Sequence, residues 1–87
     1  LNALYQQITA RLKANPESKK LMVGAQRAWV SFRDAECRFS ASAVEGGSAY
    51  PLVYGNCITV LTRSRVVTFK NYLKCQEGDF GCPVPGA

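Results

Sequence analysis

The sequence predicts an all-α fold, in which two helices form a disulfide-stapled antiparallel hairpin and a shorter N-terminal helix packs across it. Cys37 and Cys57 each lie ten residues from Gly47, in the middle of a Gly46-Gly47-Ser48 turn. If helices run on both sides of that turn, they fold back antiparallel and bring the two sulfurs to the same level. Three segments with apolar residues at helical spacing supply the helices.

The first predicted helix starts at the N-terminus and ends near Ala14. Its apolar residues recur at intervals of three and four, at Leu1, Leu4, Tyr5, Ile8 and Leu12. Asn15 is a good N-cap for the next helix. Pro16 suits the first helical position, because an N–H would have no partner there. We therefore expect a sharp break between two helices at Asn15-Pro16.

The second predicted helix runs from about Pro16 to Val44. An apolar stripe with spacings of three and four is expected to pack against the neighbouring helices; it consists of Leu21, Ala25, Ala28, Trp29, Phe32, Ala35, Phe39 and Ala43. At about 1.5 Å per residue this helix would be roughly 43 Å long. That length is large for a small domain, so a bend or early fraying is expected.

The third predicted helix follows the glycine turn and continues to about Leu73. Gly46 or Gly47 can adopt the left-handed conformation that ends a helix, and Ser48 can cap the next one. A shorter alternative begins this helix only at Asn56. Periodicity is weak beyond it, and turn residues are frequent in the last part of the chain.

The four cysteines fit a disulfide framework better than a metal site, because CxxC spacing is absent and the chain has no histidine. The symmetry about the turn selects Cys37–Cys57 and leaves Cys75–Cys82. The second bond would fold a loop-rich tail, residues 76–87, back against the third helix, with Pro83 to Ala87 poorly ordered. Disulfides indicate an oxidising compartment, which makes the protein periplasmic or secreted.

The chain has 87 residues, which is the length of one domain, and a net charge of +5. No apolar run approaches the length of a membrane span, and no signal peptide is present, as expected of a mature, trimmed chain. The charge favours anionic partners, such as acidic proteins or anionic envelope polymers, or it keeps a small protein soluble. Nucleic acid is disfavoured, because aromatic residues are not interleaved with the basic ones.

No set of catalytic residues is visible in the sequence. There is no histidine base and no GxSxG, Walker or Rossmann pattern. Asp34 and Glu36 are two residues apart and point to different helix faces, so ion pairs with Arg38 and Arg33 are the simpler interpretation. The sequence therefore predicts a binding protein without a cofactor or metal, not an enzyme.

Two segments are candidates for contact with a partner. Tyr50 and Tyr54 enclose an apolar stretch beside the glycine turn, and tyrosine is a frequent binding anchor. The alternative is that this stretch packs against the first helix or its own hairpin. The second candidate is the tail, where Glu77, Asp79 and Phe80 combine two acids with an aromatic ring.

The staple also predicts contacts between the two long helices. If Cys37 faces Cys57, opposite residues have numbers that sum to about 94. Trp29 then lies opposite Arg65, whose guanidinium can lie on the indole ring. The alternative for Arg65 is a half-buried cation that awaits a carboxylate or phosphate. We expect the structural role, with Trp29 largely buried.

Several blocks resemble a known bacterial family. They are Ala25-Gln26-Arg27-Ala28-Trp29, Phe32-Arg33-Asp34-Ala35-Glu36-Cys37, Gly46-Gly47-Ser48, and Cys57 with Thr62 and Arg65. With the opening Leu1-Asn2-Ala3-Leu4-Tyr5, they resemble the LprI-type lysozyme-inhibitor-like family over about residues 1 to 73. The resemblance implies a small exported helical domain, with Trp29 and Phe32 in the core and a protein partner, of which lysozyme is one candidate.

The resemblance leaves other functions open. An envelope or immunity protein that binds another secreted protein is one, and a cationic adaptor for anionic envelope polymers is another. Many host lysozymes are strongly basic, so a chain of charge +5 is repelled at long range. Inhibition would then need a local acidic or apolar patch, for example around Glu45 or in the segment from Glu77 to Phe80.

Overall fold

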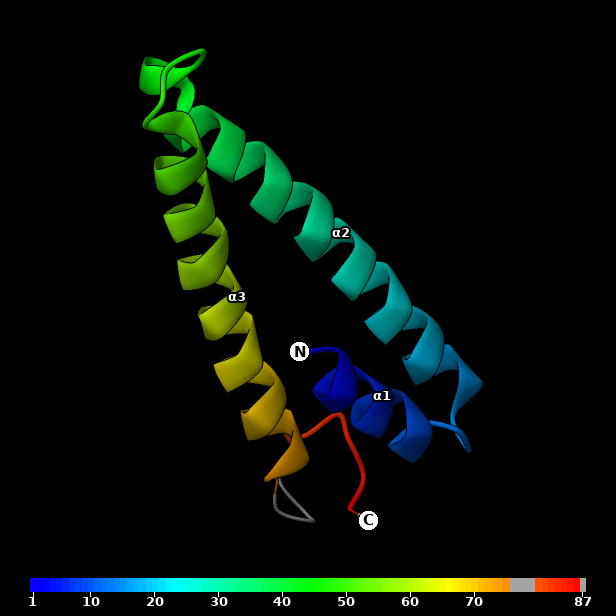
Figure 1. Ribbon diagram of the computed structural model, residues 1–87. Helices are drawn as coiled ribbons and strands as arrows, with labels where there is room; N and C mark the ends of the chain where they lie inside the picture. The colour runs from blue at the N-terminus through cyan, green and yellow to red at the C-terminus, as the bar shows by residue number, and fades with distance from the viewer. Residues whose placement is uncertain (76–79, 87) are drawn as a thin grey trace.

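A computed structural model describes residues 1–75 and 80–86 of the chain. Over these residues the elements are α1 (Asn2–Arg11), α2 (Pro16–Ser40), the short 3₁₀ helix η1 (Ser42–Val44) and α3 (Tyr50–Leu73). Helices α2 and α3 run antiparallel, meet at the turn and diverge toward the other end, where α1 lies in the opening between them (Figure 1). The molecule is elongated, measuring 50 × 21 × 20 Å. The predicted all-α stapled hairpin is confirmed.

The break between α1 and α2 lies where the sequence places it, although α1 ends at Arg11 instead of near Ala14. The Asn15 side chain accepts a hydrogen bond from the Ser18 N–H at 3.2 Å, and Pro16 occupies the first turn of α2. This cap satisfies an N–H group that would otherwise lack a partner at the helix start. The predicted cap is confirmed.

Helix α2 ends at Ser40, four residues before the predicted Val44, because the backbone tightens there into η1. The Ser42 hydroxyl donates to the Phe39 carbonyl at 2.7 Å, and the Val44 N–H donates to the Ala41 carbonyl at 3.1 Å. These bonds take up carbonyl groups that a continuing helix would use.

The turn between η1 and α3 uses one glycine for its backbone conformation. Gly46 has a φ of 81°, which is the left-handed conformation expected of Gly46 or Gly47. The predicted Ser48 cap is wrong: Ala49 is the N-cap of α3, and no side chain caps this helix end. Because α3 already begins at Tyr50, the shorter alternative that starts at Asn56 is also wrong.

The hydrophobic core lies at the broad end of the molecule, where α1 fills the opening of the hairpin. Ile8 and Leu12 of α1 pack there with Phe69 of α3 and with Val84. Val84 is 4% exposed, so the expectation of a poorly ordered segment after Cys82 is wrong for this residue. The Cys75–Cys82 disulfide brings the end of the chain back to the core.

The apolar stripe predicted to pack inside the hairpin faces solvent instead, except for Trp29. Leu21, Phe32 and Phe39 are 74%, 55% and 76% exposed. The reason is the staple, since Cys37 is fully buried and fixes which face of α2 turns toward α3. Residues one and two turns before Cys37, namely Arg33 and Trp29, therefore face inward. The placement of Phe32 in the core is thus wrong.

Candidate functional site

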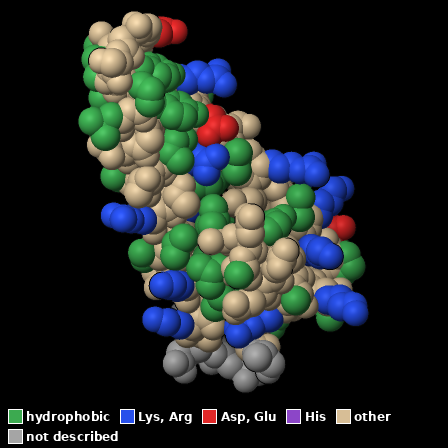
Figure 2. Space-filling model, viewed as in Figure 1, with side chains coloured by type: hydrophobic (Ala, Val, Ile, Leu, Met, Phe, Trp, Pro, Cys, Tyr) green, Lys and Arg blue, Asp and Glu red, His purple; other side chains and the backbone are tan. Residues whose placement is uncertain are grey.

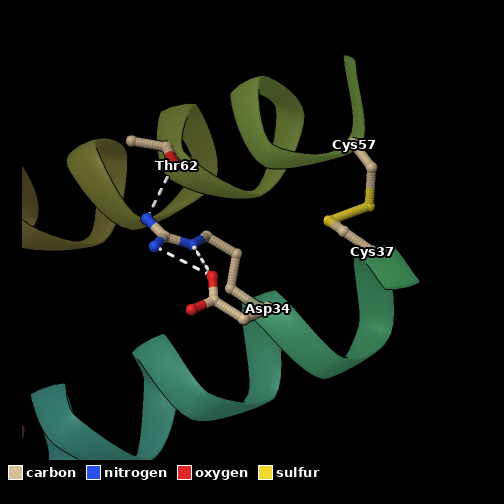
Figure 3. A network of polar contacts seen from close by, with 5 residues as sticks. Asp34, Cys37, Cys57 and Thr62 are labelled. Atoms are coloured by element: carbon tan, nitrogen blue, oxygen red, sulfur yellow. Dashed lines mark hydrogen bonds and ion pairs between the residues drawn. A yellow bond between two sulfur atoms is a disulfide. The ribbon is translucent and has the colours of Figure 1, made fainter. Parts of the chain in front are cut away.

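One disulfide joins the two helices of the hairpin, and a second joins Cys75, just after α3, to the C-terminal segment. Cys37 of α2 bonds to Cys57 of α3 with their Cα atoms 5.4 Å apart, and Cys75 bonds to Cys82 at the same Cα separation. Both predicted pairings are confirmed. The first bond clamps the two long helices close to the turn, as Figure 3 shows. It therefore fixes the geometry of everything between the two cysteines.

A polar contact crosses the hairpin just below the staple. Arg33 Nε donates to Asp34 Oδ1 at 3.0 Å, and Arg33 Nη1 donates to Thr62 Oγ1 at 3.5 Å (Figure 3). The expected ion pairs Asp34–Arg38 and Glu36–Arg33 are wrong: among the described residues, Arg33–Asp34 is the ion pair that forms. Arg33 turns toward α3, which draws Asp34 toward the hairpin as well.

Trp29 is partly buried between two arginines and lies outside the hydrophobic core, so its predicted place in the core is wrong. The guanidinium carbon of Arg33 lies 5.1 Å from the indole centroid, and that of Arg65 lies 5.7 Å from it. Arg65 also lies 4.7 Å over the Phe69 ring and donates through Nε to Gln26 at 3.0 Å. The predicted contact of Arg65 with Trp29 is confirmed. These contacts support a structural role for Arg65.

We call residues 34–62, which lie beyond the Arg33–Thr62 contact, the stapled tip. Tyr50 and Tyr54 stack on each other there with ring centroids 5.8 Å apart, and both are partly buried. They do not pack on α1, which lies at the opposite end (Figure 1). The neighbouring Leu52 and, further along α3, Val60 are exposed. The tip thus presents apolar surface on a rigid hairpin.

The stapled tip differs in charge from the rest of the protein. It contains three acids, Asp34, Glu36 and Glu45, against one base, Arg38, which gives a net charge of −2. The remaining described residues contain ten Lys and Arg side chains and a single acid, Glu17. Figure 2 shows this division on one face, with hydrophobic side chains gathered at the tip and most blue side chains below it. The net charge of +5 therefore conceals an acidic end.

The tail candidate lies only partly within the described residues. Glu77 and Asp79 lie outside the described residues. Phe80 is described, and its side chain is fully exposed. No site can therefore be built on the tail from geometry, and the stapled tip is the candidate site of this protein.

The acids of the tip could have been located from the sequence. Asp34 and Glu36 were interpreted only as members of helix ion pairs. Once Cys37 is placed opposite Cys57, however, every residue between Asp34 and Val60 belongs to one end of the hairpin. Counting charges separately for the two ends would have revealed the acidic tip. Gln26, which holds Arg65, gives no such signal.

The described residues offer no other chemistry. No cluster of three or more metal-ligating side chains occurs within residues 1–75 and 80–86. In the same part of the chain, none of the helices is sufficiently long and apolar to cross a bilayer. What the arrangement provides is a rigid, narrow, partly apolar surface for contact with another molecule.

Comparison with known proteins agrees with this architecture. A family model described as lysozyme inhibitor LprI matches residues 1–68. The chain belongs to the LprI family. The LprI match includes all of the stapled tip and most of α3. It does not include the disulfide between Cys75 and Cys82.

Among the relatives of this LprI chain is an uncharacterised protein of Rhizobium meliloti (strain 1021). The two are 27% identical over 88 aligned residues, which cover 88% of this chain and 63% of the relative. The chain thus spans less than two thirds of that protein. No solved structure matches the chain.

Proposed function

We propose that this LprI-family protein is exported to the periplasm or beyond the cell and inhibits a basic lysozyme by binding it through the stapled tip. The family description supplies the class of partner. The observation that carries the choice of surface is the acidic charge of the tip on an otherwise basic chain. Binding alone accounts for inhibition, so the proposal requires no catalytic group.

A chain of net charge +5 would be repelled by a basic lysozyme, but the uneven distribution of its charge removes this difficulty. A basic lysozyme repels the Lys- and Arg-rich broad end and attracts the tip, which orients the two proteins during their encounter. Two exposed acids, Glu36 and Glu45, would face the basic partner. Apolar contacts from Leu52 then add burial that does not depend on salt.

The shape of the molecule also supports this orientation. The protein measures about 20 Å across its two short axes, and the hairpin narrows toward the turn (Figure 1). Glycoside hydrolases hold a polysaccharide between two carboxyl groups in the active site. A narrow hairpin end, held by Cys37–Cys57, would exclude the polysaccharide by occupying the active site of the lysozyme.

Charge reversal at single acids tests the proposal. We expect Glu36→Lys and Glu45→Lys each to weaken inhibition of a basic lysozyme by about tenfold, which corresponds to about 1.4 kcal/mol. The assay is hydrolysis of a bacterial cell-wall suspension at fixed lysozyme concentration and increasing inhibitor. Glu17→Lys is the matched control, because it changes the net charge equally on an exposed acid of α2 outside the tip.

The outcomes separate the alternatives. Equal losses for Glu17→Lys and Glu45→Lys would mean that only net charge matters, and the tip would not be the binding surface. A loss confined to the double variant Glu77→Lys with Asp79→Lys would assign binding to the tail. A protein that does not inhibit at all would refute the lysozyme function and leave a different secreted protein as the partner.

A second candidate is favoured by the basic broad end. Lys19 and Lys20 of α2 and Lys70 and Lys74 near the end of α3 lie at this end and are all exposed. They would bind an anionic envelope polymer, and such binding falls steeply as salt rises. Lys19→Glu should abolish this binding and leave inhibition through the tip intact, so the two functions can be tested on the same protein.

A further inference from the structure

An unpartnered apolar face runs along α2, on the side away from α3. Its six residues are spaced alternately by four and three, which is the spacing of a coiled-coil seam. We call them the outer stripe: Leu21, Ala25, Ala28, Phe32, Ala35 and Phe39. All six are exposed. Large and small side chains alternate along much of the stripe, so a second helix could interlock with it.

An apolar pocket lies at the N-terminal end of the outer stripe. Leu21 and Ala25 line it together with residues of the broad end, namely Leu12, Tyr72, Pro83 and Val84, and its volume is about 200 Å³. A cavity of about 150 Å³ lined by apolar side chains can hold benzene. The pocket is therefore large enough for a phenyl ring, and Phe39 projects from the other end of the same stripe.

We propose that two copies of this chain pair through their outer stripes, antiparallel about a two-fold axis, with Phe39 of each copy entering the pocket of the other. In this register the numbers of opposed residues sum to about 60, with spacing taken from the coiled-coil seam. Phe39 lies opposite Leu21, and Phe32 lies opposite Ala28. Helical side chains lean toward the N-terminus of their own helix, which directs Phe39 toward Ala25 of the second copy.

The pairing satisfies the requirements of a symmetric dimer. A two-fold interface uses the same patch on both copies. Phe32 of each copy meets Ala28 of the other, and Phe39 meets Leu21, which lines the pocket. The position that flanks the seam at the axis, Ser31, is uncharged, so like charges are not opposed there despite the net charge of +5. The basic broad end of each copy comes closer to the tip of the other, where the charge is negative.

The area of the outer stripe sets the strength of the dimer. The stripe is about 27 Å long and about 10 Å wide, since a helix rises 1.5 Å per residue. This amounts to about 270 Å² on each copy, or roughly 540 Å² in total, which is less than the roughly 1,200 Å² that a stable specific interface buries. We therefore expect a dimer that dissociates on dilution and exchanges readily.

Sedimentation equilibrium of the intact chain at increasing concentration tests the pairing. The mass should rise from one copy to two and no further. Phe32→Glu should hold the protein at one copy, with an unchanged circular dichroism spectrum because the side chain is exposed. Val60→Glu, an equally exposed apolar position on α3, is the matched control and should still dimerise. A wild-type protein that stays monomeric, or equal behaviour of the two variants, would overturn the proposal.

Cross-linking with a short bismaleimide tests the antiparallel register. Ser31→Cys places two thiols near the axis and should give a covalent dimer. Gly24→Cys lies at the equivalent position one heptad earlier, where an added Cβ meets nothing within 4 Å. It should stay uncross-linked, because the two thiols would be about 20 Å apart. Equal cross-linking at both positions would indicate a parallel pair and refute the register.

Discussion

Arg65 of α3 contacts both α2 and the hydrophobic core through one side chain. Its guanidinium lies over Trp29 of α2 and over Phe69 of the core, and it is held by Gln26. Cation–π contacts are worth roughly 0.5–1 kcal/mol at exposed sites and more when water is excluded. Because no carboxylate among the described residues pairs with Arg65, the stacking and the neutral hydrogen bond define its role.

Arg65→Met separates the guanidinium from the apolar stem of this side chain. We expect the free energy of unfolding to fall by about 1–2 kcal/mol, because the cation–π contacts and the bond to Gln26 are lost while the stem still packs. Urea unfolding followed by Trp29 fluorescence measures the change. Arg63→Met is the matched control on the exposed side of α3 and should change stability by less than about 0.5 kcal/mol. Equal effects at both positions would contradict the assigned role.

At the scale of the elements, the sequence predicted correctly those features that depend only on neighbouring residues. The Asn15 cap and the Gly46 turn depend on a few adjacent residues, and both are confirmed. The apolar stripe of α2 was wrongly placed against the neighbouring helices, because apolar periodicity defines a stripe but not what covers it. The cysteine register placed Trp29 opposite Arg65 correctly. Trp29 and Cys37 determine the inward face. The outer stripe, with Phe32, is left free for another partner.

The tail has a buried residue that its local sequence does not predict. Pro83 and Pro85 flank Val84, and such a segment has no periodicity that would indicate burial. Val84 is nevertheless in the core, because the Cys75–Cys82 bond directs the chain toward Ile8 and Leu12. This contact depends on residues more than 70 positions apart in the chain, which a local pattern cannot report.

Val84→Ala tests the contribution of the tail to the core. We expect a loss of about 2 kcal/mol in the free energy of unfolding, since two buried methyl groups are removed and a small cavity remains. Val67→Ala, at an exposed position of α3, is the matched control and should be neutral or slightly stabilising, because alanine favours a helix more than valine. The measurement is thermal or urea unfolding by circular dichroism. A neutral Val84→Ala would show that the tail does not contribute to the core in solution.

At the scale of the whole molecule, stability and candidate function lie at opposite ends. The core of Ile8, Leu12, Phe69 and Val84 is at the broad end. In the stapled tip, Cys37 and Ala41 are the fully buried residues. The sequence predicted the staple and the turn that build the tip, and it named Tyr50, Tyr54 and Glu45. The acidity of the whole tip was missed, because the charges of the two ends of the hairpin were not counted separately.

The division between the two ends makes the Cys37–Cys57 bond responsible for the order of the tip. Removing it with Cys37→Ala and Cys57→Ala should cost about 3 kcal/mol in the chain-entropy estimate for a loop of this length, with a sequence separation of 20. Local opening follows the regions with the fewest buried contacts. Amides between Ser42 and Val60 should therefore lose more protection from hydrogen exchange than those of α1 and the second half of α3.

Inhibition provides the second measurement on the same variant. If the stapled tip binds lysozyme, the loss of Cys37–Cys57 should weaken inhibition even at temperatures where the core remains folded, because an ordered hairpin no longer faces the partner. Cys75→Ala with Cys82→Ala is the matched control: it removes the other disulfide, with a sequence separation of 7, and should leave inhibition unchanged. Uniform loss of hydrogen-exchange protection across α1, α2 and α3 would show that the molecule unfolds as one unit, and the tip would then have no separate stability for the staple to maintain.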